Sequence, residues 1–321
     1  MEIDEGVRGS TGDESQSIIQ FYSFLLYKYS NAQQSLIMKQ SLSTILIVSV
    51  ILIFNFTKVN AQDNTEQKIR NVAYGSFRSS KMDVYLPANR NAKTPFVILI
   101  HGGAWVMGDK FLNTAVQEAM LAKGIASINI NYRLANNTQT HYPEMLADID
   151  SAINYCIAHA EEWHTRKDGF VTSGHSAGGH LALLYAYSTN KKISAIIAES
   201  APTDVTDTAF LNYQARIGML AVVEKMANGK YVAGQAQPAG YKASSPIYHV
   251  KNIPTLLIHG TLDKTVPYAQ SVKLYSLLQS KNIIHKFLPI EGAGHDLNLN
   301  DPKTKNMITD EMITWALRYS N

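Results

Sequence analysis

The chain has 321 residues, of which 45% are hydrophobic and 17% are charged, and its formal net charge is +3. This is an ordinary globular composition with enough apolar residues for a large core. The small charge gives no indication of nucleic acid as a partner, and the single cysteine, Cys156, excludes an internal disulfide framework and a multi-cysteine metal site.

The first sixty residues have the pattern of an export signal. Met38 is followed by a lysine, a mostly apolar run covers residues 45–56, and a small residue precedes Gln62. This order matches the basic, hydrophobic and cleavage regions of a signal peptide. We therefore predict an upstream extension without function over residues 1–37, a signal peptide over 38–61 and an exported, periplasmic or secreted chain from Gln62. An uncleaved membrane anchor is the less favoured alternative, because the apolar run over residues 45–56 is shorter than the roughly twenty apolar residues that a bilayer needs.

From residue 81 onward, strand and helix patterns alternate. Residues 81–87 alternate polar and apolar side chains and end on a proline, which predicts an antiparallel edge strand. Residues 95–100 form a continuous apolar run, which is typical of a strand buried on both faces. The further predicted strands are 126–131, 170–173, 193–199, 254–259 and 285–289, and the predicted helices are 113–123, 143–163, 178–188, 268–280 and 305–319. The alternation predicts an α/β fold with a mostly parallel sheet covered by helices on both faces.

Residues 201–250 interrupt this alternation with helix-like pieces rich in Gly, Ala and Gln. We predict that they form a small cap over the strand ends. The segment contains Tyr213, Tyr231, Tyr241 and Tyr248 but no long apolar helix of the kind that binds lipid. Aromatic faces with polar tips suit sugar rings. The alternative is that these tyrosines only pack the cap.

The stretch Gly174–Gly179 reads Gly-His-Ser-Ala-Gly-Gly and places Ser176 between an apolar strand and an apolar helix. Gly174 and Gly178 leave room for the close approach of the helix to the strand. A G-x-S-x-G pattern is weak by itself, but the strand-turn-helix context is the one that a nucleophile elbow requires. Ser176 is therefore the candidate nucleophile.

Other reactive residue types follow other predicted strands. The segment His101–Trp105 follows the first buried strand and contains a glycine pair, whose bare backbone N–H groups can point at a substrate oxygen. Asp263 follows the strand at 254–259, and His295 follows the last strand. Ligands of open α/β sheets bind beyond the carboxyl ends of the strands, so these residues are expected to converge with Ser176.

The chain order Ser176, Asp263, His295 resembles that of the α/β-hydrolase fold over nearly all of the predicted mature chain. With His101–Trp105 and Gly174–Gly179, the chain resembles the hormone-sensitive-lipase-like and acetyl- and feruloyl-esterase-like group of secreted carbohydrate esterases. Two positions depart from the hormone-sensitive-lipase pattern. That pattern has a third glycine where this chain has Ala104, and an acidic residue before the nucleophile where this chain has His175. Both departures are closer to the carbohydrate-esterase or arylformamidase branches.

The roles of the three residues follow from their chemistry. Ser176 is a weak nucleophile until a base, His295, removes its proton, and Asp263 would hold the imidazole in the right tautomer. Asp204 and Asp296 are alternative acids, and Glu199 could face the site or serve as a capping or ion-pairing residue. His259 is expected to pack.

The oxyanion would be held by the N–H groups of Ala177 and of the Gly103–Ala104 stretch. Which of Gly102, Gly103 and Ala104 donates stays open. Trp105 lines the acyl pocket or packs the loop. Residues 159–164 contain two histidines and two glutamates, but His159 and His164 are five residues apart and so off one helical face, and a solvated helix end is favoured over a metal site.

These observations predict a serine carboxylester hydrolase that works through an acyl-enzyme without a metal or cofactor. The expected substrate is a small-molecule, oligosaccharide or polysaccharide ester with a short acyl group, acetyl or feruloyl. The alternatives are an arylformamidase-like amidase, a peptidase and a non-catalytic binding module on the same fold. The sequence gives no oligomeric state.

Overall fold

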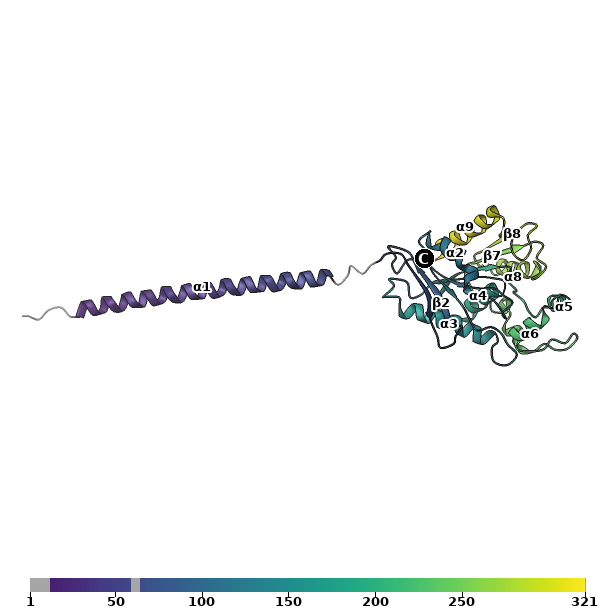
Figure 1. Ribbon diagram of the computed structural model, residues 1–321, viewed down its shortest axis with the longest axis horizontal. Coiled ribbons are helices and arrows are strands. Elements are labelled where there is room, and N and C mark those ends of the chain that lie inside the picture. Colours follow the sequence, from purple (N-terminus) through teal and green to yellow (C-terminus); the bar gives the residue numbers. More distant parts are fainter. Residues whose placement is uncertain (1–11, 59–63, 321) are drawn as a thin grey trace, which may run out of the picture. The chain divides into compact units, whose positions relative to one another are not determined.

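The computed structural model describes residues 12–58 and 64–320, and the chain divides into two units at residues 63 and 64. In the first unit, a single helix, α1 (Gly12–Lys58), runs through most of the predicted signal peptide (Figure 1). The predicted cleavage site before Gln62 lies outside the described residues. Among the described residues, no helix has the length and apolar character that a membrane crossing requires.

The second unit is built on one sheet, which within residues 64–320 has the strand order β1-β2-β4-β3-β5-β6-β7-β8. β2 pairs antiparallel with β1 and β4, and all other neighbours are parallel. The strands are β1 (Gln67–Ala73), β2 (Lys81–Leu86), β3 (Phe96–Ile100), β4 (Ala126–Ile130), β5 (Phe170–His175), β6 (Ile193–Glu199), β7 (Thr255–Gly260) and β8 (His285–Ile290).

Helices cover both faces of this sheet. The core on one face joins α2 and α9 to side chains such as Leu99 and Ile197, and the core on the other joins α3, α4 and α8 to side chains such as Ile98 and Ile128. The helices are α2 (Thr114–Leu121), α3 (Tyr142–Ala158), α4 (Ala177–Ser188), α8 (Ala269–Ser280) and α9 (Pro302–Tyr319), with a 3-10 turn η1 (Lys110–Asn113) before α2. This is the α/β-hydrolase fold, so the predicted fold class is confirmed.

The predicted edge position of residues 81–87 is wrong, because β2 lies between β1 and β4. The polar residue that produces the alternation, Asp83, is buried and forms an ion pair of 2.8 Å with Lys110 Nζ. It also accepts a hydrogen bond of 2.8 Å from the backbone N–H of Asn71. A buried carboxylate with such partners has the same sequence pattern as one that faces water. The edge strand is β1.

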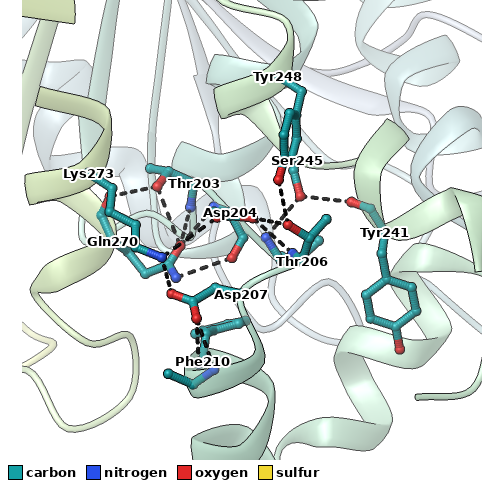
Figure 2. A network of polar contacts seen from close by, with 12 residues as sticks. Thr203, Asp204, Thr206, Asp207, Phe210, Tyr241, Ser245, Tyr248, Gln270 and Lys273 are labelled. Atoms are coloured by element: carbon teal, nitrogen blue, oxygen red, sulfur yellow. Dashed lines mark hydrogen bonds and ion pairs between the residues drawn. The ribbon is translucent and has the colours of Figure 1, made fainter. Parts of the chain in front are cut away.

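The insertion between β6 and β7 consists of short helices and turns (Figure 1), namely α5 (Thr208–Arg216), α6 (Leu220–Ala227), α7 (Ala239–Ala243) and η2 (Pro246–Tyr248). Figure 2 shows how its first residues are fixed to α8. Gln270 Oε1 accepts hydrogen bonds from the backbone N–H groups of Thr203 (2.9 Å) and Asp204 (2.8 Å), and Gln270 Nε2 donates to the Asp204 carbonyl (3.2 Å). The start of the insertion is thereby held at the carboxyl end of β6.

Candidate active site

Ser176 occupies the turn between β5 and α4 in a backbone conformation with φ 56° and ψ −120°. A non-glycine residue in such a region costs of order 1–3 kcal/mol and persists only where its surroundings hold it. Here the Ser176 N–H donates to the Glu199 carbonyl at 2.7 Å, and the Ser176 carbonyl accepts from the His180 N–H at 3.0 Å. The nucleophile is thus fixed by the next strand and by its own helix.

Gly174 and Gly178 flank the elbow, and neither position has room for a side chain. A Cβ atom at Gly174 would lie 2.6 Å from the Ile100 carbonyl oxygen, and one at Gly178 would lie 2.1 Å from the same atom. Both distances are far below van der Waals contact. The close approach of α4 to β3 therefore accepts only hydrogen at these two positions.

The structure brings Ser176, His295 and Asp263 together in one line of hydrogen bonds. His295 Nε2 lies 2.9 Å from Ser176 Oγ, and His295 Nδ1 lies 2.7 Å from Asp263 Oδ2. Because a carboxylate only accepts, Nδ1 carries the proton and Nε2 is free to accept the serine proton. This is the tautomer that a histidine needs to act as a general base on a hydroxyl.

Asp263 is bound by more than His295. Its Oδ1 accepts from the backbone N–H groups of Thr265 (2.8 Å) and Val266 (2.9 Å), and its Oδ2 lies 3.1 Å from Nε2 of the buried His259. Burial alone would raise the pKa of Asp263, but the hydrogen bonds from His259 and His295 outweigh it and hold the pKa well below its usual range. Asp263 therefore stays ionised, and His259 contacts it as well as packing.

The two alternative acids lie elsewhere. Asp204 Oδ1 accepts from the N–H and the hydroxyl of Thr206, and Asp204 Oδ2 lies 3.8 Å from Lys273 Nζ (Figure 2). Asp296 is exposed and accepts a weak hydrogen bond of 3.3 Å from the Asn298 N–H. Neither carboxylate takes the position of Asp263 against His295.

The predicted oxyanion loop has an unusual backbone. Gly103, Ala104 and Trp105 have φ values of 120°, 48° and 62° in succession. Within residues 64–320, the backbone N–H groups of Gly103, Ala104 and Ala177 donate no hydrogen bond to another protein group. Ala177 is also the first residue of α4, where the helix dipole favours negative charge. These N–H groups are available for a substrate oxygen.

A small cavity of about 20 Å³ opens beside Ser176, with Ala104, Trp105 and Ala177 in its wall. The other lining residues are Pro202, Phe210, Gln214, Met219, Val222, Thr265 and Val266. Trp105 is only 3% exposed and donates its indole N–H to His180 Nδ1 at 3.1 Å. It therefore both lines the cavity and packs the loop, so the two alternatives for Trp105 hold together.

Sequence reasoning overlooked the contacts of two histidines beside the nucleophile. His175 Nε2 donates to the His295 carbonyl at 2.8 Å and so holds the loop that carries the base. Burial and the nearby His295 lower the pKa of His175 to about 4, so it is neutral at pH 7. His180 is fully buried in α4. The available signal was the presence of two histidines in an otherwise apolar stretch around Ser176.

The four tyrosines of the insertion have partners within the protein. Tyr241 is fully buried and donates to the Gly229 carbonyl at 3.0 Å, so for this tyrosine the alternative holds and it packs the cap. Tyr213 and Tyr231 also form hydrogen bonds through their hydroxyls. Tyr248 is 49% exposed, with its hydroxyl 2.8 Å from Thr206 Oγ1 and the Lys242 ammonium over its ring at 5.4 Å from the centroid. Among the described residues, no group of three or more His, Cys, Asp or Glu side chains is placed to hold a metal ion.

A family model described as BD-FAE matches residues 82–278, which is more than half of the chain. Esterase LipC of Mycobacterium tuberculosis is 27% identical over 247 residues, which are 72% of this chain and 60% of that protein. Kynurenine formamidase of Salmo salar is 29% identical over 119 residues, 37% of this chain and 38% of that protein. The chain spans only part of the curated relatives that it matches. The matched part is 52%, 60% and 63% of the length of three of them.

Among solved structures, the chain is similar to one titled "Truncated form of carbohydrate esterase from gut microbiota". The TM-score is 0.63 at 23% sequence identity, and the match covers 80% of this chain and 98% of that one. At this identity the likeness concerns the fold.

Proposed function

The chain belongs to the BD-FAE family, and from this premise we propose that it is a serine carboxylester hydrolase. The observation that carries the proposal is the line of hydrogen bonds from Ser176 Oγ through the His295 ring to Asp263. The elbow and the unpaired N–H groups of the oxyanion loop support it. The similarity to esterase LipC agrees with this chemistry.

The geometry supports the following steps. Ser176 Oγ attacks the ester carbonyl carbon while His295 Nε2 takes its proton, and the ionised Asp263 stabilises the imidazolium. The negative oxygen of the tetrahedral intermediate is bound by backbone N–H groups of Ala177 and of the Gly103–Ala104 stretch. The alcohol leaves with the proton of His295, and a water activated by the same ring then releases the acyl group from Ser176.

Removal of the nucleophile or the base tests the proposal. Ser176→Ala and His295→Ala are each expected to lower kcat by about 10⁶-fold, and the double variant should be no worse than either, because the residues act as a unit. Asp263→Asn should cost less, about 10⁴-fold. The measurement is hydrolysis of p-nitrophenyl acetate, with thermal unfolding as the control for folding. Near-normal turnover by Ser176→Ala would disprove the assignment.

The expected substrate is a short acyl group on a carbohydrate, and the cavity favours acetyl over feruloyl. About 20 Å³ holds roughly one water-sized group, which suits the methyl of an acetyl unit but not an aromatic ring. The insertion supplies Gln214 to the cavity wall and also exposes Tyr248, an aromatic side chain with a polar tip, and such groups suit an alcohol with several hydroxyls. A carbohydrate esterase shares the fold.

Acyl-chain length and alcohol type test this substrate class. We expect kcat/KM to fall as the acyl chain grows past about four carbons, since the cavity has room for roughly one water-sized group and each further methylene must displace the side chains of its wall. It should rise when the alcohol is a sugar, because remote contacts then contribute to transition-state binding. The measurements use p-nitrophenyl esters of graded length, acetylated xylan and methyl ferulate. Equal or faster hydrolysis of long-chain lipids would contradict the proposal.

A second candidate function is that of an arylformamidase, and the observation in its favour is the similarity to kynurenine formamidase. This similarity covers a shorter part of the chain than the similarity to esterase LipC. Fast hydrolysis of N-formyl kynurenine with none of acylated sugars would favour this candidate.

A further inference from the structure

His180 connects the nucleophile helix to two other parts of the site. It lies in α4, four residues after Ser176, and is fully buried. Its Nδ1 accepts the indole N–H of Trp105 at 3.1 Å, and its Nε2 lies 2.7 Å from the Ser244 carbonyl in the insertion. An indole N–H only donates, so Nδ1 must be the acceptor and Nε2 must carry the proton. Both ring nitrogens are therefore used, in one fixed tautomer.

The loop that His180 reaches is strained. Ala104 and Trp105 both have left-handed backbone angles, each of which costs of order 1–3 kcal/mol. On the main chain, the Trp105 carbonyl accepts the Ala135 N–H at 2.8 Å. The indole ring packs edge-on against the imidazole with 5.1 Å between ring centroids. The side chain of Trp105 is thus held from α4, while the N–H groups of Val106 (3.1 Å) and Met107 (3.0 Å) donate to the Gly103 carbonyl and hold the main chain of the loop.

We propose that His180 is a positioning residue that fixes Trp105 and, through it, the preceding Gly103–Ala104 stretch whose N–H groups would bind the oxyanion. The proposal rests on the esterase function proposed above. His180 also ties this loop to the insertion through Ser244, so the cavity wall and the oxyanion donors keep one arrangement. Burial lowers the pKa of His180 to about 4, which keeps the ring neutral and able to accept from Trp105 at pH 7.

Two amide variants separate the two hydrogen bonds. His180→Asn places an acceptor oxygen near the position of Nδ1 and keeps the Trp105 contact, whereas His180→Gln reaches the position of Nε2 and keeps the Ser244 contact. Trp105→Phe removes only the indole donor and the second ring. His249→Asn is a matched control, since His249 Nε2 also bonds to an insertion carbonyl, that of Ala243, at 3.0 Å.

We expect His180→Gln and Trp105→Phe each to lower kcat by about 10- to 100-fold, because a displaced oxyanion donor loses part of its effect. KM for p-nitrophenyl acetate should change less than kcat, and inhibition by a trifluoromethyl ketone should weaken in parallel with kcat/KM. The thermal midpoint should fall by a few degrees, because each variant removes one partner of a buried hydrogen bond. The variant that combines His180→Gln with Trp105→Phe should be no slower than either single variant, because both substitutions remove the same hydrogen bond. His180→Asn should retain most activity, and His249→Asn should match the wild type.

A second readout does not depend on turnover. Hydrogen exchange of the Trp105 indole N–H, assigned by its absence in Trp105→Phe, should be slow in the wild type and in His180→Asn and fast in His180→Gln. If the wild type is active and His180→Gln has normal kcat, the inference is overturned while the esterase function stands. If no variant and no wild type hydrolyses esters, the proposed function fails. Unchanged indole exchange in His180→Gln would then overturn the Trp105 contact as well.

Discussion

Asp263 shows how a single carboxylate can be shared by two histidines without losing its role. His259 has its Nδ1 occupied by Ser271 Oγ at 2.7 Å, and its Nε2 also lies 2.9 Å from the Val266 carbonyl. His259 therefore donates to Asp263 from a fixed position and leaves the second contact of Oδ2 to His295. Two donors on one oxygen keep the carboxylate charged, so it can stabilise the imidazolium that forms during catalysis.

Glu199 gives a prediction at the same scale. It ends β6 beside the nucleophile, is 7% exposed, and within residues 64–320 its carboxyl forms no hydrogen bond or ion pair. Burial raises the pKa of Glu199 to about 7. The folded state therefore binds the proton more tightly than the unfolded state, so this contribution to stability is present below the ordinary pKa of about 4.5 and lost as pH rises through about 7.

Replacement by an amide should remove this pH dependence. Glu199→Gln is expected to be more stable than the wild type above pH of about 7, and the difference should disappear below about 4.5. Urea unfolding at a series of pH values measures it. Parallel stability curves for the two proteins would show that Glu199 is not a buried acid in the folded state.

At the scale of elements, the close contact between α4 and β3 predicts that an alanine at Gly178 destabilises the protein, although helix propensity alone predicts the opposite. Gly→Ala in a helix interior usually stabilises by up to about 1 kcal/mol. At Gly178 the new Cβ would meet the Ile100 carbonyl at 2.1 Å, so Gly178→Ala should destabilise by about 1–3 kcal/mol and lower activity.

Gly124→Ala is the matched control. Gly124 has φ +75° but no atom within 4 Å of its would-be Cβ, so this variant measures backbone strain without crowding. Chemical denaturation of both variants separates the two effects. A Gly178→Ala protein as stable as the wild type would mean that α4 can move away from β3.

The elements that sequence predicted well are those with an unambiguous pattern. The strand at 193–199 and the helix at 268–280 agree with β6 and α8 to within a residue. The strand is a nearly continuous apolar run, and the helix begins just after a proline. The helix predicted over 143–163 ends at Ala158, where turns follow, since polar and aromatic residues there fit either state. Strand β1 was not predicted, because its mostly exposed residues show no apolar face.

The same distinction applies to the site. Ser176, Asp263 and His295 could be predicted because each follows a strand in a recognisable loop, and the structure places them within hydrogen-bond distance of one another. The contacts of His175 and His180 could not, since they join residues 120 and 64 positions apart in the chain. Such pairings depend on the packing of the insertion and of the last loop, which a single sequence does not encode as a local pattern.

At the scale of the whole molecule, the chain separates into residues 1–63 and 64–321. The two cores extend over buried residues from Tyr74 to Ala316, and the candidate site residues lie between Gly103 and His295. The second unit therefore contains its own hydrophobic core together with the complete candidate site. This is what independent folding of a domain requires.

A chain that begins at Gln62 should consequently fold and keep the full activity. We expect its kcat/KM for p-nitrophenyl acetate to equal that of the full-length protein within about two-fold, because removal of residues 1–61 takes away no member of the site. The predicted signal peptide adds a second expectation, that the protein exported by its native host begins at Gln62. Amino-terminal mass spectrometry measures this, and a peptide that spans Ala61 and Gln62 in the mature protein would instead indicate an uncleaved anchor. An active full-length protein with an inactive chain from Gln62 would show that the first unit contributes to the site.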